Sequence, residues 1–289
     1  PQAQYVIGQI YESQTRFAEA AKAFELMEKF KTNESAADAV LNAGLIWEAI
    51  GKPKKAIKVY KKYIKLFKKR TDTPAVAFRI CVLQEEMGGK KNLKKALKSY
   101  KSFVKKFKES KALVVEALTR AGYINLGLRP KKNRKSTIKL YEKAVTAYGE
   151  LKESGQPLGQ AKYFAARAAF DLAEFLYQDF HSIVLTEKSL GRGRAAKKIK
   201  KMKEIVEAKA EAHQTAEKAF EAIGAYLEPQ WAASASYRVA LLYYEFARML
   251  LDAPIPDGLP IEMEDQYSFF LEQKAAPVEE KALVMFKQA

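Results

Sequence analysis

Cysteine, histidine, glycine and proline are all scarce in this sequence of 289 residues, and each scarcity excludes something. The single cysteine, Cys81, excludes an intramolecular disulfide and leaves no cysteine-based metal site. His181 and His213 fall on different predicted helices without a matching carboxylate pair, which argues against metal binding and histidine-dependent catalysis. With only 14 glycines and 10 prolines and 48% hydrophobic residues, the chain is not disordered. We expect a folded, non-catalytic protein without a metal or cofactor.

Long apolar runs are also missing. No stretch approaches the ~20 consecutive apolar residues of a membrane span, and no signal peptide is recognisable. The chain opens on Pro1 and enters a repeat almost at once, while residues 286–289 resemble the middle of a helix. We interpret the sequence as a piece of a longer protein, so the missing leader leaves the compartment open.

A repeat with a period of 36 residues is the most informative feature that is present. Its first two copies are Gly8, Tyr11, Ala20 and Phe24, then Gly44, Trp47, Ala56 and Tyr60. Two looser copies, with three extra residues between their halves, are Cys81, Gln84, Ala96 and Tyr100, then Gly122, Asn125, Thr137 and Tyr141. A period in this range indicates stacked helical hairpins, each of which buries its apolar face against its neighbours.

This pattern resembles the tetratricopeptide repeat, which has a small residue at position 8, an aromatic at 11, alanine at 20 and an aromatic at 24. Residues 3–30 and 37–67 fit closely, and residues 75–150 fit mainly by their second helices. The resemblance implies an all-α fold, an α-solenoid of tetratricopeptide-like antiparallel helical hairpins in a right-handed superhelix. We expect four such hairpins over residues 1–155. Divergent hairpins continue the same solenoid over residues 156–289, including one long helix at about 195–227.

Local signals predict where some helices begin and end. Asn33 and Asp72 are expected to cap helices. Residues 161–180 are rich in alanine with aromatic residues at helical spacing, which indicates a central helix packed on more than one side. Ala276-Pro277 is expected to break a helix, because proline removes a backbone donor.

The resemblance implies that the first helix of each hairpin lines a concave face that holds a peptide or a partner helix. Positions 5 and 9 of the four first helices are Tyr5, Gln9, Leu41, Leu45, Phe78, Val82, Thr119 and Tyr123. Most are apolar, and an exposed apolar groove of this length would mark a recognition surface. The alternative is that superhelical winding, or the helix beginning at Ala161, fills the groove.

Charge is distributed unevenly around the formal total of +17. Residues 1–203 contain 44 basic and 19 acidic residues, a net charge of +25, whereas residues 204–289 contain 7 and 15, a net charge of −8. Such a gradient of charge along a chain can steer association with an acidic partner.

The resemblance also implies which positions of the second helices face outward, and most of them are lysine. The predicted basic surface comprises Lys54, Lys55, Lys58, Lys61, Lys62, Lys65, Lys94, Lys95, Lys98, Lys101, Lys105, Lys139 and Lys143. It could bind an anionic membrane surface, an anionic envelope polymer or nucleic acid, or it could be a solvated helix face. Nucleic acid is disfavoured, because 40 of the 51 basic residues are lysine and no outward aromatic is available for stacking.

Together these patterns predict a non-catalytic scaffold for protein partners. The carboxylates are scattered over polar helix faces, and the Gly191-Arg192-Gly193-Arg194 stretch is too short for a phosphate-binding loop. The repeats are similar to those of large proteins of Gram-negative cell envelopes, which implies a bacterial envelope complex. We therefore favour a periplasmic or cell-envelope location and leave the cytoplasm open.

Overall fold

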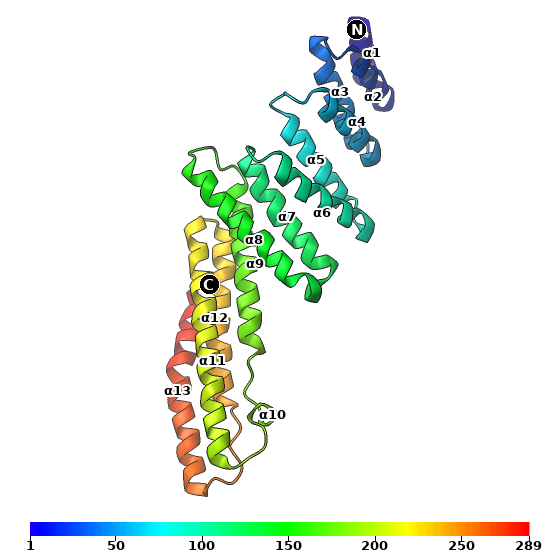
Figure 1. Cartoon of the computed structure of the whole chain (residues 1–289). Helices are drawn as coiled ribbons and strands as arrows, with labels where there is room; N and C mark the ends of the chain where they lie inside the picture. The colour runs from blue at the N-terminus through cyan, green and yellow to red at the C-terminus, as the bar shows by residue number, and fades with distance from the viewer. Residues whose placement is uncertain (289) are drawn as a thin grey trace. The chain divides into compact units, whose positions relative to one another are not determined.

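The computed structural model describes residues 1–288, and every regular element in that range is a helix (Figure 1). The α-helices are α1 (Gln2–Ser13), α2 (Phe17–Glu25), α3 (Glu34–Ala49), α4 (Pro53–Leu66), α5 (Thr73–Glu86), α6 (Gly89–Lys106), α7 (Lys111–Leu128), α8 (Pro130–Glu153), α9 (Ala161–Ser182), α10 (Glu187–Leu190), α11 (Ala195–Glu221), α12 (Pro229–Leu251) and α13 (Ile261–Gln288). Two 3-10 helices are η1 (Leu26–Phe30) and η2 (Ala222–Tyr226). The expected all-α solenoid of paired neighbouring helices is confirmed.

The chain divides into two compact units. Unit 1 comprises Pro1–Lys143 and Glu150–Pro157, and unit 2 comprises Ala144–Gly149 and the chain from Leu158 onward. The long helix α8 contributes to both units, because its residues 144–149 belong to unit 2. Each unit has its own core and is described separately below.

In unit 1, each glycine at position 8 makes room for the aromatic ring at position 24 of the same hairpin. A Cβ atom added to Gly8 would lie 2.5 Å from the Phe24 ring, and one added to Gly44 would lie 2.2 Å from the Tyr60 ring. The fourth hairpin repeats the arrangement, with 2.3 Å between a Cβ on Gly122 and the ring of Tyr141. In these three hairpins the two helices therefore approach so closely that the aromatic ring occupies the space of a Cβ atom on the glycine.

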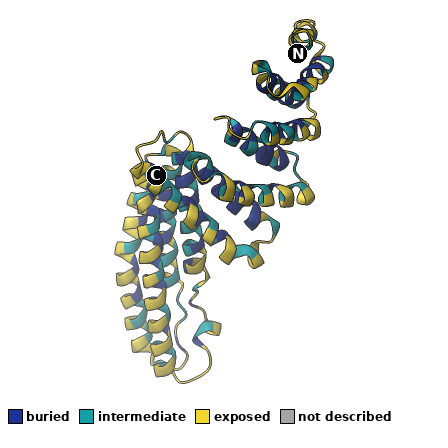
Figure 2. Ribbon diagram, turned by 45° about the horizontal axis from the view of Figure 1, so that its top comes forward, coloured by how far each residue is buried: buried dark blue, intermediate teal, exposed yellow. Residues whose placement is uncertain are grey.

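The core of unit 1 follows the repeat (Figure 2). The residues at position 20 of the four hairpins, Ala20, Ala56, Ala96 and Thr137, are all fully buried. Small side chains at the crossing point bring the helices together, and larger ones such as Met27 and Tyr63 fill the space on either side. Burial of this kind is the main source of hairpin stability, at about 25 cal/mol per Å² of apolar surface.

The predicted caps of unit 1 differ from one another. The Asn33 side chain accepts a hydrogen bond from the backbone N–H of Ser35 at 3.1 Å, so it caps α3 as expected. Asp72 was expected to cap α5 but makes no such bond. Its carboxylate instead accepts from the Tyr63 hydroxyl of α4 at 2.7 Å and from the guanidinium of nearby Arg70.

In unit 2, α9 packs against α11, α12 and η2, as the alanine and aromatic pattern of residues 161–180 predicts. Phe164, Phe175 and Phe180 are buried, and the ring of Phe170 lies 5.6 Å from that of Phe220 on α11. Alanines between these rings allow helices to approach α9 from more than one side. Both α9 and α11 are longer than the first helices of unit 1.

Two boundaries in unit 2 are set by packing more than by local sequence. The long helix expected at about 195–227 is α11, and the chain then tightens into η2. The break expected at Pro277 is wrong, because α13 continues through it. The carbonyl that proline leaves unpaired belongs to Gln273, which is exposed and open to water, while buried Ala275 and Ala282 hold the helix on both sides.

Polar contacts link α9 to α11 and α12 in unit 2. The Glu245 carboxylate on α12 accepts a hydrogen bond from Tyr177 and pairs with exposed His181, both on α9, and Arg238 of α12 pairs with Glu174 of α9. The ammonium of Lys209, only 3% exposed, donates to the carbonyl oxygens of Phe180 and Ile183 at 2.9 and 3.0 Å. These carbonyls lie at the C-terminal end of α9, where a cation is favourable. Burial nevertheless lowers the Lys209 pKa to about 8.

Candidate functional site

The eight predicted groove residues do not share one environment. Gln9, Leu45 and Tyr123, all at position 9, are exposed, and the last two expose 48% and 56% of their surface. Tyr5 and Leu41 are half-buried against the core of unit 1. Position 9 is therefore exposed on three of the four first helices.

Phe78, Val82 and Thr119 correct the prediction, because they are 8%, 7% and 1% exposed and belong to the core. The Phe78 ring packs against those of Tyr100 and Phe103, at 5.7 and 5.4 Å between centroids. The Thr119 hydroxyl donates to the Val115 carbonyl at 3.1 Å. Phe78 and Thr119, at position 5, and Val82, at position 9, are therefore not available to a partner.

A hollow of about 430 Å³ lies beside Leu45, between α3 and α5. Its apolar lining comes from Leu45, Ala49, Pro53, Leu83 and Met87, and its charged lining from Glu48, Arg79 and Glu86. Its volume falls within the usual range of ligand pockets, and its mixed lining suits an apolar side chain with a polar neighbour.

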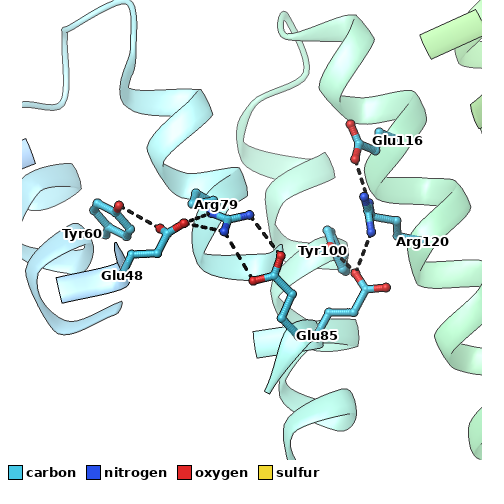
Figure 3. Close-up of polar contacts among 8 residues, drawn as sticks. Glu48, Tyr60, Arg79, Glu85, Tyr100, Glu116 and Arg120 are labelled. Carbon is cyan, nitrogen blue, oxygen red and sulfur yellow. Dashed lines mark hydrogen bonds and ion pairs between the residues drawn. The ribbon is translucent and has the colours of Figure 1, made fainter. Parts of the chain in front are cut away.

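The charged wall of this hollow is an ion-pair network (Figure 3). The Glu48 carboxylate accepts from the Tyr60 hydroxyl at 3.0 Å and from Arg79 Nε at 2.8 Å. The guanidinium of Arg79 also reaches Glu86, at 3.3 Å. Arg79 thus joins the last turns of α3 and α5, and it fixes the width of the hollow between them.

The next hairpin repeats this network. The Tyr100 hydroxyl donates to the Glu85 carboxylate at 2.6 Å, and Arg120 on α7 reaches the same carboxylate at 3.3 Å. Arg120 Nε also donates to Glu116 at 2.7 Å. Glu48 with Tyr60 and Arg79 therefore matches Glu85 with Tyr100 and Arg120 (Figure 3). We call these two trios the carboxylate ladder.

The carboxylate ladder escaped the sequence analysis, although the repeat contains its signal. A glutamate occurs at position 12 of hairpins two and three, directly after the aromatic or polar residue at position 11. An arginine occurs at position 6 of the first helix that follows, 31 residues beyond Glu48 and 35 beyond Glu85. Comparing charged residues between copies, instead of only small and aromatic ones, would have found both trios.

Burial and charge shift the pKa values of the ladder residues in directions that keep its hydrogen bonds in place. Burial, together with the Glu48 and Glu85 charges, raises the pKa of Tyr60 and of Tyr100, so both hydroxyls remain donors. Burial raises the pKa of Glu116 above its ordinary value of 4.5, against the opposing effect of Arg120. The carboxylate ladder keeps neighbouring helices in register, and the positions of its residues are explained without a catalytic role.

The predicted basic surface is exposed, with one exception. Lys62 is half-buried and pairs with Glu28 of the preceding hairpin at 2.8 Å. Lys55 is exposed, with its ammonium 4.0 Å from the centre of the Trp47 ring. Within residues 1–288, the other eleven lysines of this surface have neither an ion-pair nor a ring partner.

The remaining candidates for catalysis or metal binding are Cys81, His181 and His213, and the structure shows what each of them contacts. Cys81 is 3% exposed, and burial raises the pKa of its thiol to about 12, so it packs as a small buried side chain and not as a reactive thiolate. His181 pairs with Glu245, and His213 lies apart from it in the core, against Tyr243. No group of three potential metal ligands gathers within residues 1–288. None of the helices in that range combines the length and apolar character of a membrane-spanning segment.

Comparisons with known proteins agree with the hairpin geometry. The sequence profile of the tetratricopeptide repeat matches residues 38–69, which include most of α3 and all of α4. Comparison of the sequence with curated proteins finds no match.

Two solved structures are similar in fold. One is a tetratricopeptide repeat protein from Parabacteroides merdae ATCC 43184, with 15% identity, a TM-score of 0.40, and coverage of 93% of this chain and 98% of that one. The other is the apo form of RapI, with 13% identity, a TM-score of 0.41, and coverage of 100% and 99%. At these scores neither structure carries an argument about function.

Proposed function

We propose that the chain is a tetratricopeptide repeat protein, which the profile match over residues 38–69 supports, and that it is a non-catalytic scaffold that holds a peptide or partner helix on the first helices of unit 1. The observation that carries the proposal is the hollow beside Leu45, where an exposed leucine adjoins an ordered charged wall. An apolar anchor of the partner would enter the hollow, and a polar group of the partner would meet the Glu86 end of the Arg79 network.

Two features make this hollow suited to a protein partner. The ion pairs of Arg79 with Glu48 and Glu86 hold its walls before a partner arrives, which reduces the ordering cost of binding. Exposed Gln9 on α1 and Tyr123 on α7 occupy the same repeat position as Leu45, whereas Val82 at that position of α5 is buried. Position 9 can therefore contribute contacts from hairpins one, two and four.

The experiment is to place a photo-crosslinking residue at Leu45 in cells, identify the captured protein, and measure its affinity for purified variants. Leu45→Glu should weaken binding at least tenfold, because it replaces an apolar contact with a third carboxylate in a hollow that Glu48 and Glu86 already line. Val184→Glu is the matched control, since Val184 is 54% exposed and lies in unit 2. Equal affinity of both variants and the unchanged protein, with helicity preserved by circular dichroism, would refute this site.

The cellular location of the scaffold is a further part of the proposal. The similarity of the repeats to those of large Gram-negative envelope proteins supports a place in a bacterial envelope complex, periplasmic or membrane-associated. Fractionation of cells that produce the full-length protein tests this placement. Recovery in the cytoplasmic fraction alone would contradict it.

A second candidate function uses the lysines of α4 and α6. These two helices contain six and eight lysines and no acidic residue, and all but Lys62 of these side chains are exposed. Like charges one turn apart destabilise a helix by about 0.2–0.5 kcal/mol per pair. An anionic partner would therefore reduce the repulsion between neighbouring lysines on α4 and α6. This surface would bind an anionic membrane, an envelope polymer or nucleic acid by charge alone, at about 1 kcal/mol per lysine near a lipid surface.

The test of this second candidate is adsorption to vesicles with and without anionic lipid, and to duplex DNA, at low and high salt. Changing Lys58, Lys61 and Lys65 to glutamate should lower adsorption to every anion that binds. A control with Lys188 and Lys218 of unit 2 changed to glutamate should differ much less, because these lysines lie outside the predicted basic surface. Unchanged adsorption would identify the surface as a solvated helix face.

A further inference from the structure

A second hollow lies in unit 2, between the three longest of its later helices. It has a volume of about 320 Å³ and lies between α11, α12 and α13. Phe246 and Leu250 of α12, Met202 and Val206 of α11, and Leu271 and Val278 of α13 contribute its apolar surface. Hollows of this size and composition are typical of small-molecule sites.

The hollow is apolar and partly open to solvent. Leu250 and Leu271 are 4% and 6% exposed, whereas Phe270 at its rim is 52% exposed. Water binds only weakly in such a hollow, because few polar groups there can form hydrogen bonds with it. A hydrocarbon chain would remove this surface from water and gain the usual hydrophobic stabilisation.

The charges around the hollow are mostly positive. Lys203 of α11 and Lys274 of α13 both line it, and the Lys274 ammonium lies 5.5 Å from the centre of the Phe270 ring. Lys203 has no ion-pair partner within residues 1–288. It belongs to a run of five lysines at positions 197–203, two of which pair with Asp257 and Glu204. One acidic residue, Glu207, lines the hollow one turn beyond Lys203.

We propose that this hollow binds a single-chain carboxylate, with its alkyl chain against Phe246 and Leu250 and its head group between Lys203 and Lys274. An apolar body next to two ammonium groups is complementary to an anionic amphiphile and to few other ligands. A neutral hydrocarbon would gain nothing from either lysine, and a cationic ligand would be repelled by them. The volume suits one chain and not the two chains of a membrane phospholipid.

The experiment is isothermal titration of the full chain with dodecanoate below its micellar concentration. We expect saturable binding of one dodecanoate per chain, and at least tenfold weaker binding of 1-dodecanol, which has the same chain without the charge. Comparable binding of dodecanol would overturn the proposal, because the lysines would then take no part. Absence of saturable dodecanoate binding would overturn it as well.

Four variants test the position of the ligand. Changing Lys203 and Lys274 together to glutamate should weaken dodecanoate binding at least tenfold, and Val206→Trp should abolish it by filling the hollow. The control changes Lys218 and Lys287 to glutamate, which gives the same change in net charge at exposed positions outside the lining. If Val206→Trp fails to fold, the lysine variant decides, since both of its side chains are exposed.

The fourth variant, Glu207→Gln, distinguishes an anionic ligand from a cationic one. It removes the single negative charge of the lining, so dodecanoate should bind more tightly, by about threefold or more. Weaker binding of dodecanoate to this variant would contradict the placement of the head group. Equal binding of dodecanoate to the control and to the lysine variant would place the ligand elsewhere on the chain.

Discussion

Unit 1 and unit 2 are both built of helices, but they keep those helices in register in different ways. In unit 1 the same contacts recur, since the Gly44 and Tyr60 pair has counterparts in other hairpins and the carboxylate ladder occurs twice. In unit 2 the contacts include pairs that are more widely separated in the sequence. The Tyr177 and Glu245 bond joins residues 68 positions apart, about twice the 35 that separate Glu85 from Arg120.

This difference predicts how each unit responds to damage. Repeated contacts between neighbours make the stability of a solenoid a sum of local terms, so a defect is felt mainly by adjacent hairpins. Contacts between distant segments make several helices depend on one another, so a defect spreads through them. Unit 1 should therefore lose structure hairpin by hairpin, and unit 2 should lose it as a whole.

The largest expected effect comes from removing one buried phenylalanine in each unit. Phe24 and Phe220 are each 1% exposed, and either change to alanine should cost about 3–5 kcal/mol of local stability. Hydrogen exchange should show lost protection confined to α1–α3 for Phe24→Ala but spread over α9, α11 and α12 for Phe220→Ala. Loss over the same number of helices in both variants would erase the distinction between the units.

A smaller effect tests the glycine and aromatic pairs. Gly44→Ala should destabilise the protein by about 1–2 kcal/mol in urea unfolding, because the added Cβ would lie 2.2 Å from the Tyr60 ring. Gly149→Ala on α8 is the matched control, since nothing lies within 4 Å of its added Cβ. It should stabilise the protein by about 0.5–1 kcal/mol through helix propensity. Equal effects of the two changes would show that the repeat glycines are not packing positions.

The carboxylate ladder should contribute less than either packing feature. Arg79→Ala removes bonds to Glu48 and Glu86 at a partly exposed site, and we expect a loss of about 1 kcal/mol in urea unfolding. Arg16→Ala breaks only the exposed pair with Glu19 and should cost less than about 0.5 kcal/mol. If Arg79→Ala and Arg16→Ala lower the free energy of unfolding equally, the carboxylate ladder contributes nothing to the register of the helices.

The smallest effect, and the one that differs in sign between the units, is the response to acid. Burial lowers the pKa of His213 below its ordinary 6.5, so the unfolded state binds the proton more readily and unit 2 loses stability as pH falls below that value. Glu217, Lys209, Lys281 and Tyr243 surround this ring. Unit 1 has no histidine, and burial raises the Glu116 pKa, so protonation of Glu116 in acid favours its folded state.

The measurement is hydrogen exchange of each unit at about pH 7 and about pH 5. Protection in α11 and α12 should fall relative to α5 and α7, and His213→Gln should remove most of the difference. A matching fall in the helices of unit 1 would assign the acid response to some other group. A fall that persists in His213→Gln would do the same within unit 2.

The sequence predicted the parts of the fold that depend on one hairpin or its neighbour. Gly8 with Phe24 and Gly44 with Tyr60 could be recognised as contacts, because the spacing within a hairpin fixes which residues meet. The groove remains a prediction: Leu45 and Tyr123 are exposed, but Phe78, Val82 and Thr119 belong to the core. The same repeat position is exposed in one hairpin and buried in the next, because burial depends on how neighbouring hairpins pack and not on position within the repeat alone.

The sequence by itself determined that this chain forms stacked helical hairpins, because the small and aromatic residues that let two helices touch recur at a fixed interval. Only the tertiary structure decided which charges meet. Arg79 could pair with any carboxylate within reach of its long side chain, and Lys209 could have remained at the surface. Such pairings depend on the distance between side chains from separate helices, which no interval within the sequence specifies.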